Sequence, residues 1–198
     1  RLLAPAPGET VLDLCAAPGG KTMQLAAAGA EVTALDISGP RLKRLHENLA
    51  RTGLTATVVT ADVLHWRPET LFDAVLLDAP CSATGTIRRH PDLPFVKDGL
   101  EIAGLVALQA QMIDRALGFV KPGGRLVFCT CSLLPEEGEA QLQAALARHP
   151  TLSVEQPDIP GVDPCWLAKG GGLRLRPDYW ADKGGMDGFF MARLRLPA

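Results

Sequence analysis

The sequence has little net charge and few aromatic residues. Its 198 residues carry a formal charge of −2, and only 5% of them are Phe, Trp or Tyr. Such a charge gives no overall basic field to attract nucleic acid, so any grip on RNA has to come from local patches or from another domain. No apolar run approaches the roughly 20 residues that a membrane span needs, and there is no signal-peptide pattern. We therefore expect no membrane partner.

Disulfide and metal patterns are also missing. Five cysteines is an odd number, and their spacing fits no disulfide framework, which favours a reducing cytoplasm as the location. Cys129 and Cys131 form a Cys-x-Cys pair without a second pair or a nearby His, so no metal ion is expected. We also expect a monomer. The chain begins at Arg1 rather than Met, and we expect it to be part of a longer protein.

What the sequence does contain is an alternation of apolar runs with helical periodicity, which predicts an α/β fold. The helices are expected up to residue 28 and over 40–52, 100–120 and 135–149, with Ser38 capping the second and Gly53 ending it. Long irregular segments are expected at 83–99 and 156–187, the latter with a short extended piece near Arg174 and Arg176. The predicted fold is a doubly wound, mostly parallel sheet of seven strands, Rossmann-like, with its last strand antiparallel at or near an edge. The strands are expected at 10–14, 31–35, 56–60, 72–77, 125–129, 152–155 and 187–194.

The fourth strand organises the rest of the chain. Residues 74–77 are four apolar residues in succession, as in a strand buried on both faces of a parallel sheet. Pro80 cannot continue the ladder, so Asp78 and Cys81 follow the carboxyl end of the strand, where open α/β sheets bind ligands. Taken alone, Cys81 could simply be a packed cysteine. However, the fifth strand delivers Cys131 to the same edge, which predicts two thiols over one crevice.

The loop after the first strand, residues 15–22, allows two interpretations. Gly20, Lys21 and Thr22 match the end of a phosphate-binding P-loop, but that pattern requires glycine where this chain has Cys15. Pro18 would also remove one of the N–H groups that cradle the phosphate. No dinucleotide-binding glycine pattern is present either. The remaining interpretation is the first loop of an S-adenosylmethionine (SAM) site, where small residues let the backbone approach the amino-acid end of the cofactor.

Two further carboxylates follow strands. Asp36 ends the second strand, where an acid can accept the ribose hydroxyls of an adenosine; it could equally cap the next helix together with Ser38. Asp62 follows the third strand and could bond the adenine amine, or only shape a turn. In the long loop, Arg88, Arg89 and His90 form a basic cluster that could hold phosphates or simply be solvated.

Four motifs, in their order along the chain, resemble a known family. They are D-L-C-A-A-P-G-G-K-T at 13–22, D-A-P-C-S at 78–82, T-C-S-x-x-P-E-E at 130–137 and D-G-F-F at 187–190. This combination resembles the RNA cytosine-5 methyltransferases of the Sun/Fmu (RsmB/NOP/Sun) type. The resemblance implies a class I SAM-dependent methyltransferase fold and a single catalytic domain over 1–198, without the N-terminal RNA-binding region that family members usually carry. It also implies that SAM is held by Cys15, Ala16, Ala17, Pro18, Gly19, Gly20, Lys21, Asp36, Asp62 and Asp78.

The resemblance further implies a mechanism with two thiols. Cys131 adds to C6 of cytosine, which makes C5 nucleophilic enough to accept a methyl group, and Cys81 assists release of the product. Asp78 and Lys21 orient and polarise the base and the cofactor. The residues alone do not show which thiol attacks C6, because DNA cytosine-5 methyltransferases attack from a Pro-Cys motif like the one at Cys81. The base must be unstacked, so the expected partner is single-stranded or looped RNA, with ribosomal RNA the expected kind.

Two other functions stay open. The chain could be a SAM-dependent methyltransferase with another nucleic-acid target, although N-methyltransferases acting on exocyclic amines usually place an aromatic residue where this chain has Cys81. A DNA enzyme would leave Cys131 unexplained. Alternatively, the chain could be a SAM-binding RNA-assembly factor without catalysis, against which the pair of thiols argues.

Overall fold

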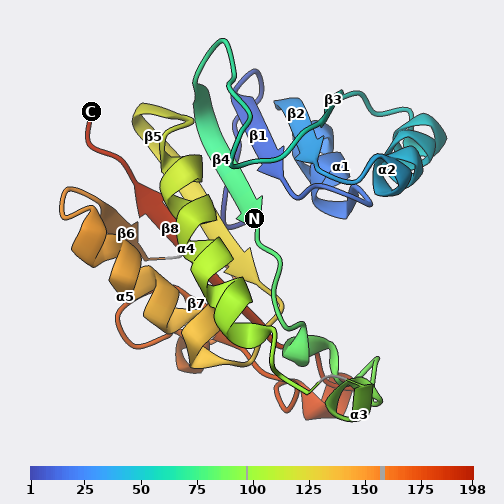
Figure 1. Ribbon diagram of the computed structural model, residues 1–198, viewed down its shortest axis with the longest axis vertical. Helices are drawn as coiled ribbons and strands as arrows, with labels where there is room; N and C mark the ends of the chain where they lie inside the picture. Colours follow the sequence, from blue (N-terminus) through green and yellow to red (C-terminus); the bar gives the residue numbers. More distant parts are fainter. Residues whose placement is uncertain (97, 157–158) are drawn as a thin grey trace.

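A single mixed sheet runs through the computed structural model, which describes residues 1–96, 98–156 and 159–198. Residues 97, 157 and 158, which fall in the two predicted irregular segments, lie outside the described residues. Within these ranges the sheet has eight strands, and helices cover both of its faces (Figure 1). The strands are β1 Thr10–Leu14, β2 Glu31–Asp36, β3 Thr57–Thr60, β4 Phe72–Asp78, β5 Val120–Thr130, β6 Ser153–Glu155, β7 Leu173–Leu175 and β8 Phe189–Arg195.

The strand order confirms the predicted doubly wound fold. It reads β3-β2-β1-β4-β5-β8-β6, with β7 pairing β8 off this path. The first five strands are parallel to their neighbours, whereas β8 is antiparallel to β5, β6 and β7. The predicted seven strands make up the path itself. The extended piece near Arg174 adds the short eighth strand.

The helices lie close to their predicted positions. Ser38 Oγ accepts a hydrogen bond from the Arg41 N–H at the start of α2, and Gly53 ends that helix with a left-handed backbone at φ 65°. Both were predicted from the sequence. The α-helices are α1 Gly20–Ala27, α2 Gly39–Thr52, α3 Leu93–Val96, α4 Ile102–Leu117 and α5 Glu139–Arg148, and the 3₁₀ helices are η1 Thr84–Thr86, η2 Pro135–Glu137, η3 Pro164–Trp166 and η4 Ala181–Lys183. No helix in the described ranges is both long and apolar enough to span a membrane.

Three predicted elements differ in their bounds. The helix expected over 100–120 ends at Leu117, and Val120 already belongs to β5. The strand expected at 125–129 begins at Val120, because Phe72 pairs with Val120 while Ala74 already pairs with Arg125, so residues 121–124 form a bulge. The helix expected over 135–149 is split at Gly138. A Cβ at Gly138 would lie 2.8 Å from Cγ of Phe190, so β8 approaches the chain too closely there for any larger residue.

Alternation along the strands produces two cores. Leu12 and Val75 belong to the core that α4 covers, and Val11 and Leu76 belong to the core that contains Leu25 of α1. This is the period of two that strands impose on their side chains. The sheet is therefore buried on both faces, which holds the loops at the carboxyl ends of β1, β4 and β5 in place.

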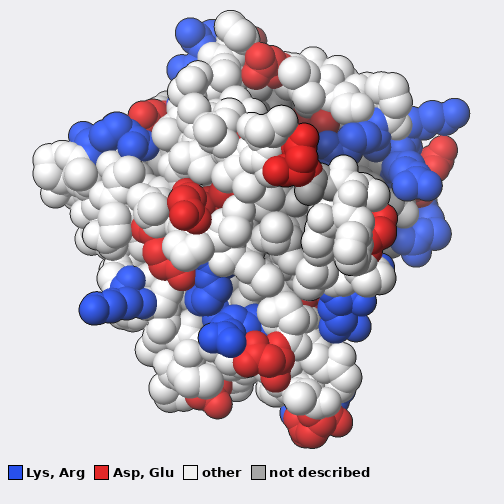
Figure 2. Space-filling view, turned by 60° about the horizontal axis from the view of Figure 1, so that its bottom comes forward, with Lys and Arg blue, Asp and Glu red and all other residues white. Residues whose placement is uncertain are grey.

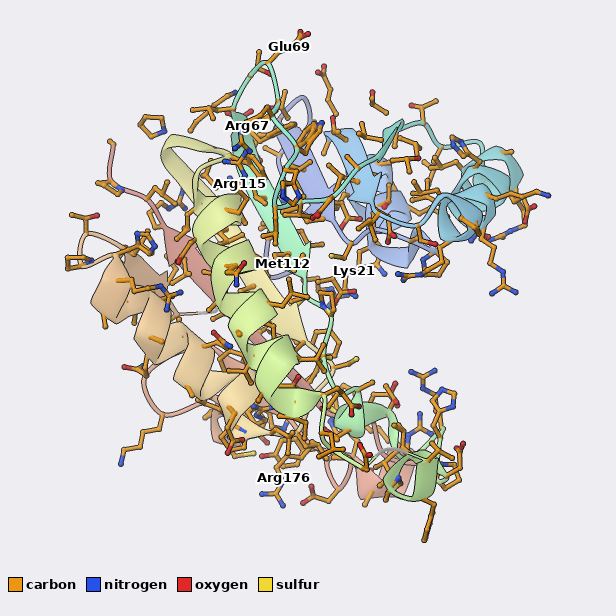
Figure 3. The ribbon with its side chains drawn as sticks, in the orientation of Figure 1. Lys21, Arg67, Glu69, Met112, Arg115 and Arg176 are labelled. Atoms are coloured by element: carbon orange, nitrogen blue, oxygen red, sulfur yellow. The ribbon has the colours of Figure 1, made fainter. Side chains whose placement is uncertain are left out.

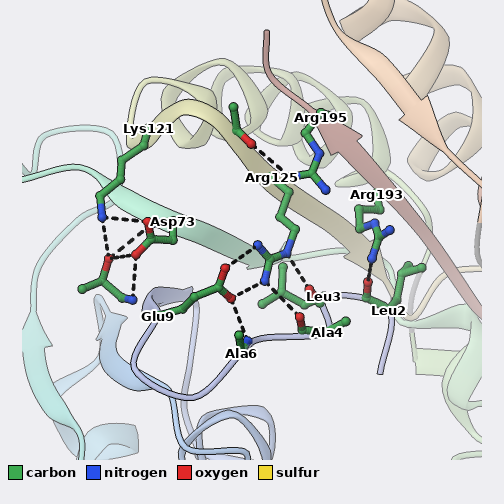
Figure 4. Close-up of polar contacts among 12 residues, drawn as sticks. Leu2, Leu3, Ala4, Ala6, Glu9, Asp73, Lys121, Arg125, Arg193 and Arg195 are labelled. Atoms are coloured by element: carbon green, nitrogen blue, oxygen red, sulfur yellow. Dashed lines mark hydrogen bonds and ion pairs between the residues drawn. The ribbon is translucent and has the colours of Figure 1, made fainter. Parts of the chain in front are cut away.

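A polar cluster holds the opposite edge of the sheet to the N-terminal segment (Figure 4). Arg125, 7% exposed, donates to the carbonyls of Leu3 and Ala4 and pairs with Glu9 at 2.5 Å. The Arg125 guanidinium is the main reason that the pKa of Glu9 is lowered. This cluster lies at the far end of β5 from Cys131, so it fixes the sheet and leaves the carboxyl ends clear.

Candidate active site

The two predicted thiols meet at the carboxyl edge of the sheet. Asp78 at the end of β4 lies beside Cys129 of β5, and the Ala79 N–H donates to the Cys129 carbonyl. This pairing brings the Cys81 and Cys131 sulfur atoms to within 3.5 Å of each other. The sequence predicted this meeting from strand order alone, because parallel strands that are neighbours end at the same edge.

The two thiols differ in acidity. A hydrogen bond from the Cys81 thiol lowers the pKa of Cys131, and this effect outweighs the burial and the Asp78 charge that raise it. The same hydrogen bond, together with burial, raises the pKa of Cys81 well above its usual value. Because a thiolate is the nucleophilic form of cysteine, Cys131 is the better prepared nucleophile of the two.

An ion pair stands next to the thiols. Nζ of Lys21, which enters from the first turn of α1, lies 2.7 Å from Oδ2 of Asp78 (Figure 3). Burial lowers the pKa of Lys21, but the Asp78 charge and its hydrogen bond more than offset this, so the pKa is raised. Lys21 also lies 5.4 Å from the ring centroid of Phe189, and Cys129 donates to Asp78 at 3.5 Å. A protonated amine and a carboxylate are thus held together beside the sulfur pair.

The loop after β1 has the shape of a cofactor cradle. Gly19 has φ 102°, and a Cβ there would lie 2.9 Å from Leu45 Cγ, so only glycine fits. Cys15 also has a left-handed backbone, at φ 61°. Burial, with the Asp36 and Asp78 charges, raises the pKa of the Cys15 thiol to about 12. This cysteine therefore stays a neutral, packed side chain rather than a nucleophile.

Residues of this loop line a cavity of about 640 Å³. Lys21 and Asp78 lie on its wall, and so does Asp13, which is fully buried. Thr22 donates to Oδ2 of Asp13 at 2.6 Å, but Oδ1 has no hydrogen-bond partner among the described residues. Burial raises the pKa of Asp13 to about 7. An unpartnered carboxylate oxygen fits a ligand with a cationic end, as SAM has, and the sequence analysis did not single out Asp13.

Asp62 makes the turn contact that its alternative interpretation predicted, whereas the side-chain cap of α2 comes from Ser38 and not from Asp36. Asp36, 2% exposed, accepts hydrogen bonds from the N–H groups of Ala17 and Ser38. The first of these bonds holds the backbone of the loop after β1 in place. Asp62 accepts from the Leu64 N–H, which lowers its pKa. Among the described residues, neither carboxylate is part of the cavity lining. Their predicted contacts with the cofactor stay predictions.

Sequence reasoning missed a buried carboxylate behind the thiols. Glu137 appeared in the sequence only as part of the motif at 130–137 and was given no role of its own, yet it is fully buried. Its carboxylate accepts from the Ser82 N–H at 3.0 Å, from the Ser82 hydroxyl at 2.5 Å and from Gln109 at 2.9 Å. Gln109 also donates to the Pro80 carbonyl at 2.8 Å. The one signal in the sequence for a role near the thiols was that Ser82 and Glu137 belong to the two motifs that contain Cys81 and Cys131.

The basic cluster predicted in the long loop lies on the protein surface. Arg88 and Arg89 both pair with Asp187, at 3.4 and 2.7 Å, and His90 is exposed. Within the described ranges no group of three or more His, Cys, Asp or Glu could hold a metal ion.

The sheet order and the loop after β1 define a Rossmann-like α/β domain. The N-methyltransferase NodS from Bradyrhizobium japonicum shares this fold, with a TM-score of 0.60 over 100% of this chain and 90% of that chain, at only 17% identity.

The particular family follows from closer relatives: the chain belongs to the RsmB/F family, whose sequence model, described as 16S rRNA methyltransferase RsmB/F, matches residues 1–195. The ribosomal RNA small subunit methyltransferase B of Salmonella arizonae is 46% identical over 97% of this chain and 43% of its own length. NSun6 from Pyrococcus horikoshii, solved with SFG, has a TM-score of 0.86 at 30% identity over 98% of this chain and 50% of that chain. The chain thus spans about half the length of these relatives or less.

Proposed function

We propose that this chain is the catalytic part of an enzyme that transfers a methyl group from SAM to C5 of a cytosine in RNA. The observation that carries the proposal is the 3.5 Å contact between the Cys81 and Cys131 sulfur atoms, beside the Lys21–Asp78 pair and the loop cavity. The names of the relatives favour ribosomal RNA of the small subunit as the substrate.

The cradle after β1 is where we place SAM. When bound there, SAM supplies a methyl group on a positively charged sulfur. Residues 15–21 would hold the cofactor along the loop, and the unpartnered oxygen of Asp13 would interact with its cationic end. Asp36 and Asp62 complete the site at the adenosine end, in line with the family resemblance. Asp78 and Lys21 stand between this cavity and the thiols, so they are placed to orient the cytosine.

In the proposed reaction the Cys131 thiolate forms a bond to C6 of the cytosine. The electron pair of the C5–C6 double bond would then become available at C5 and form the bond to the methyl group. The bond between that methyl group and the SAM sulfur breaks and leaves its electron pair on the sulfur. The proton on C5 must leave before the bond between sulfur and C6 breaks and the double bond returns. Cys81 assists this release. The lowered pKa of Cys131 and the raised pKa of Cys81 support this order of the two thiols.

Cys131→Ala tests the nucleophile. The variant should transfer no tritiated methyl groups to RNA while its calorimetric SAM titration stays unchanged. Cys165→Ala is the matched control, because Cys165 is an exposed thiol on η3. Turnover near the wild-type rate in Cys131→Ala would show that Cys131 is not the nucleophile. If the variant loses methyl transfer but still binds RNA and SAM, the wild-type protein is an enzyme and not a non-catalytic assembly factor.

Cys81→Ala tests the release step. The variant should accumulate a covalent protein–RNA adduct, because C6 stays bonded to Cys131, and this adduct should survive a denaturing gel. The band should vanish in the double variant Cys81→Ala/Cys131→Ala. Absence of the band in Cys81→Ala, with Cys131 present and methyl transfer measurable in the wild type, contradicts the role of Cys81.

We also propose that residues 1–198 form one catalytic domain, and that a further RNA-binding region supplies part of the grip on the substrate. The net charge of −2 and the 43% coverage of the S. arizonae protein support this division. On the face shown in Figure 2, the basic side chains stand in separate groups among acidic and uncharged ones. A longer protein with the region before Arg1 should therefore bind the same RNA more tightly than this chain. The monomeric state and the cytoplasmic location stay predictions.

A further inference from the structure

Three aromatic side chains gather in the segment between β6 and β8. Trp166 stacks on Tyr179 with ring centroids 5.9 Å apart, and its ring meets Trp180 edge-on at 5.2 Å. We call these three residues the aromatic cluster. Trp166 is buried, but 46% of Trp180 is exposed. The cluster holds two of the three tryptophans and the only tyrosine of the chain.

Two residues of the aromatic cluster belong to the wall of the site cavity. Trp166 and Trp180 line the cavity of about 640 Å³ that Pro18, Lys21 and Asp78 also line. Trp180 therefore stands at the rim of the same hollow as the cofactor loop. Its indole is not needed to fill the core, because nearly half of it faces solvent. An exposed large aromatic side chain at the mouth of a site indicates a contact with a ligand.

Trp180 is also held in a fixed and unusual conformation. Its backbone lies in the left-handed region at φ 55°, which a bulky residue rarely adopts. Neighbouring contacts hold it there: the Gly185 N–H donates to the Trp180 carbonyl at 2.9 Å, and the Trp166 ring packs against the indole. Strained residues of this kind concentrate at ligand sites, where the surrounding structure enforces them. The backbone of Trp180 is thus fixed in a position that leaves the residue partly exposed.

One cationic side chain lies against this indole, and two more lie near its neighbours Tyr179 and Gly185. The Lys183 ammonium lies 4.9 Å from the Trp180 ring centroid, and the Arg176 guanidinium lies 5.9 Å from that of Tyr179. Arg176 is at the lower end of the molecule in Figure 3. Arg88 is close by, since a Cβ on Gly185 would lie 3.5 Å from its Cδ. Aromatic faces with nearby Lys and Arg are the combination with which proteins bind unpaired nucleic acid: bases stack and phosphates pair.

We propose that Trp180 is a stacking site for an unpaired RNA base that flanks the target cytosine, with Lys183 contacting the adjoining phosphate. This inference rests on the proposed function, because that function brings an unstacked cytosine to Cys131. Lys21 and Asp78, which stand beside that thiol, line the same cavity as Trp180. A cytosine pulled out of its stack leaves its neighbour with an uncovered face. The indole at the rim is placed to cover that face and so to hold the flanking nucleotide while the cytosine reaches Cys131.

Loss of the stacking contact should weaken the affinity for RNA by a predictable factor. Stacking of one base on an aromatic residue is worth about a 5- to 150-fold difference in affinity. Trp180→Ala should therefore raise the RNA Kd and the KM for RNA within that range, with a smaller effect on kcat. The SAM Kd should stay unchanged, which also shows that the variant is folded. Trp180→Phe should restore most of the affinity, because it keeps an aromatic face.

The experiment uses this chain and a single-stranded RNA of about 12 nucleotides that contains cytosine, a length within the range such sites cover. A second set of RNAs carries one abasic position at a time beside the cytosine. Trp66→Phe is the matched control, because Trp66 is partly buried and packs against Phe72 and Phe119. In the wild type, one flanking abasic position should weaken binding; in Trp180→Ala the same change should have no further effect.

The outcomes are separable. An RNA Kd in Trp180→Ala equal to that of the wild type and of Trp66→Phe overturns the inference, and so does a wild type that binds none of the RNAs. A raised SAM Kd would assign Trp180 to the cofactor and also overturns it. If the wild type binds RNA through Trp180 but transfers no methyl group to it, the proposed function fails while the stacking site stands.

Discussion

The effect on stability of removing the buried carboxylate of Glu137 can be worked out from its hydrogen bonds. This carboxylate accepts three hydrogen bonds from Ser82 and Gln109, at 3.0, 2.5 and 2.9 Å, and it is fully buried. Through Gln109 it is also connected to the carbonyl of Pro80, which precedes Cys81. The change to test is Glu137→Gln, with Glu137→Ala as the more severe variant.

The magnitude follows from the bonds that are lost. A hydrogen bond to a charged group contributes about 1.5–3 kcal/mol, and a buried donor that loses its acceptor costs about 1–3 kcal/mol. Such losses are not additive within one network. Glu137→Gln keeps one acceptor oxygen and places an NH₂ group against other donors, so we expect a loss of about 2–3 kcal/mol of unfolding free energy. Glu137→Ala removes the acceptor for both neighbours and leaves space behind, so about 3–5 kcal/mol is expected.

Urea unfolding followed by circular dichroism measures this loss, and the adjacent Glu136 provides the control. Glu136 is exposed, so Glu136→Gln removes the same charge one residue away and should change stability by no more than about 0.5 kcal/mol. With SAM bound, the variants should keep the same order of stability in urea. Equal unfolding midpoints for Glu137→Gln, Glu136→Gln and the wild type would refute the reasoning.

The remaining predictions concern the site itself. Asp36→Ala should raise the SAM Kd in a calorimetric titration, because the N–H groups of Ala17 and Ser38 lose their acceptor and the loop loses its shape; an unchanged Kd removes Asp36 from the site. The alkylation rate of Cys131, followed by peptide mass spectrometry, should rise with pH and level off below the pH of an ordinary thiol, because its folded pKa is lowered. In Cys81→Ala that midpoint should move to higher pH, because the hydrogen bond that stabilises the thiolate is gone; identical profiles would contradict this cause.

Local patterns were enough to predict most of the fold and the meeting of the thiols. The apolar run 74–77 and Pro80 fix the end of β4, and strand order then brings Cys131 next to Cys81. Each of these steps depends on a neighbouring stretch of sequence or on the rule that parallel strands end at the same edge. The same holds for Ser38 and Gly53 at the two ends of α2.

What the sequence did not reveal depends on contacts between distant segments. Glu137 and the exposed Glu136 look alike in sequence, and only the position of Ser82, 55 residues away, decides which of them is buried. The aromatic cluster is likewise invisible in a chain where Trp166 and Trp180 look like isolated residues in an irregular stretch. The early start of β5 at Val120 reflects a bulge that pairing with β4 imposes, against the helix-ending pattern of residues 121–124.

Two glycines explain why the D-G-F-F motif is part of the site although it carries no reactive group. The Gly188 N–H donates to the Gly85 carbonyl at 2.7 Å, and the Gly85 N–H donates to the Cys131 carbonyl at 2.9 Å. A Cβ on Gly85 would collide with the Gly188 carbonyl and lie 2.9 Å from the Cys131 carbonyl oxygen. The loop after Cys81, the end of β5 and the start of β8 can therefore meet only where both residues lack side chains. The distance between the two sulfur atoms thus depends on three motifs at once: two of them supply the thiols, and the third supplies the close backbone approach that holds those thiols together.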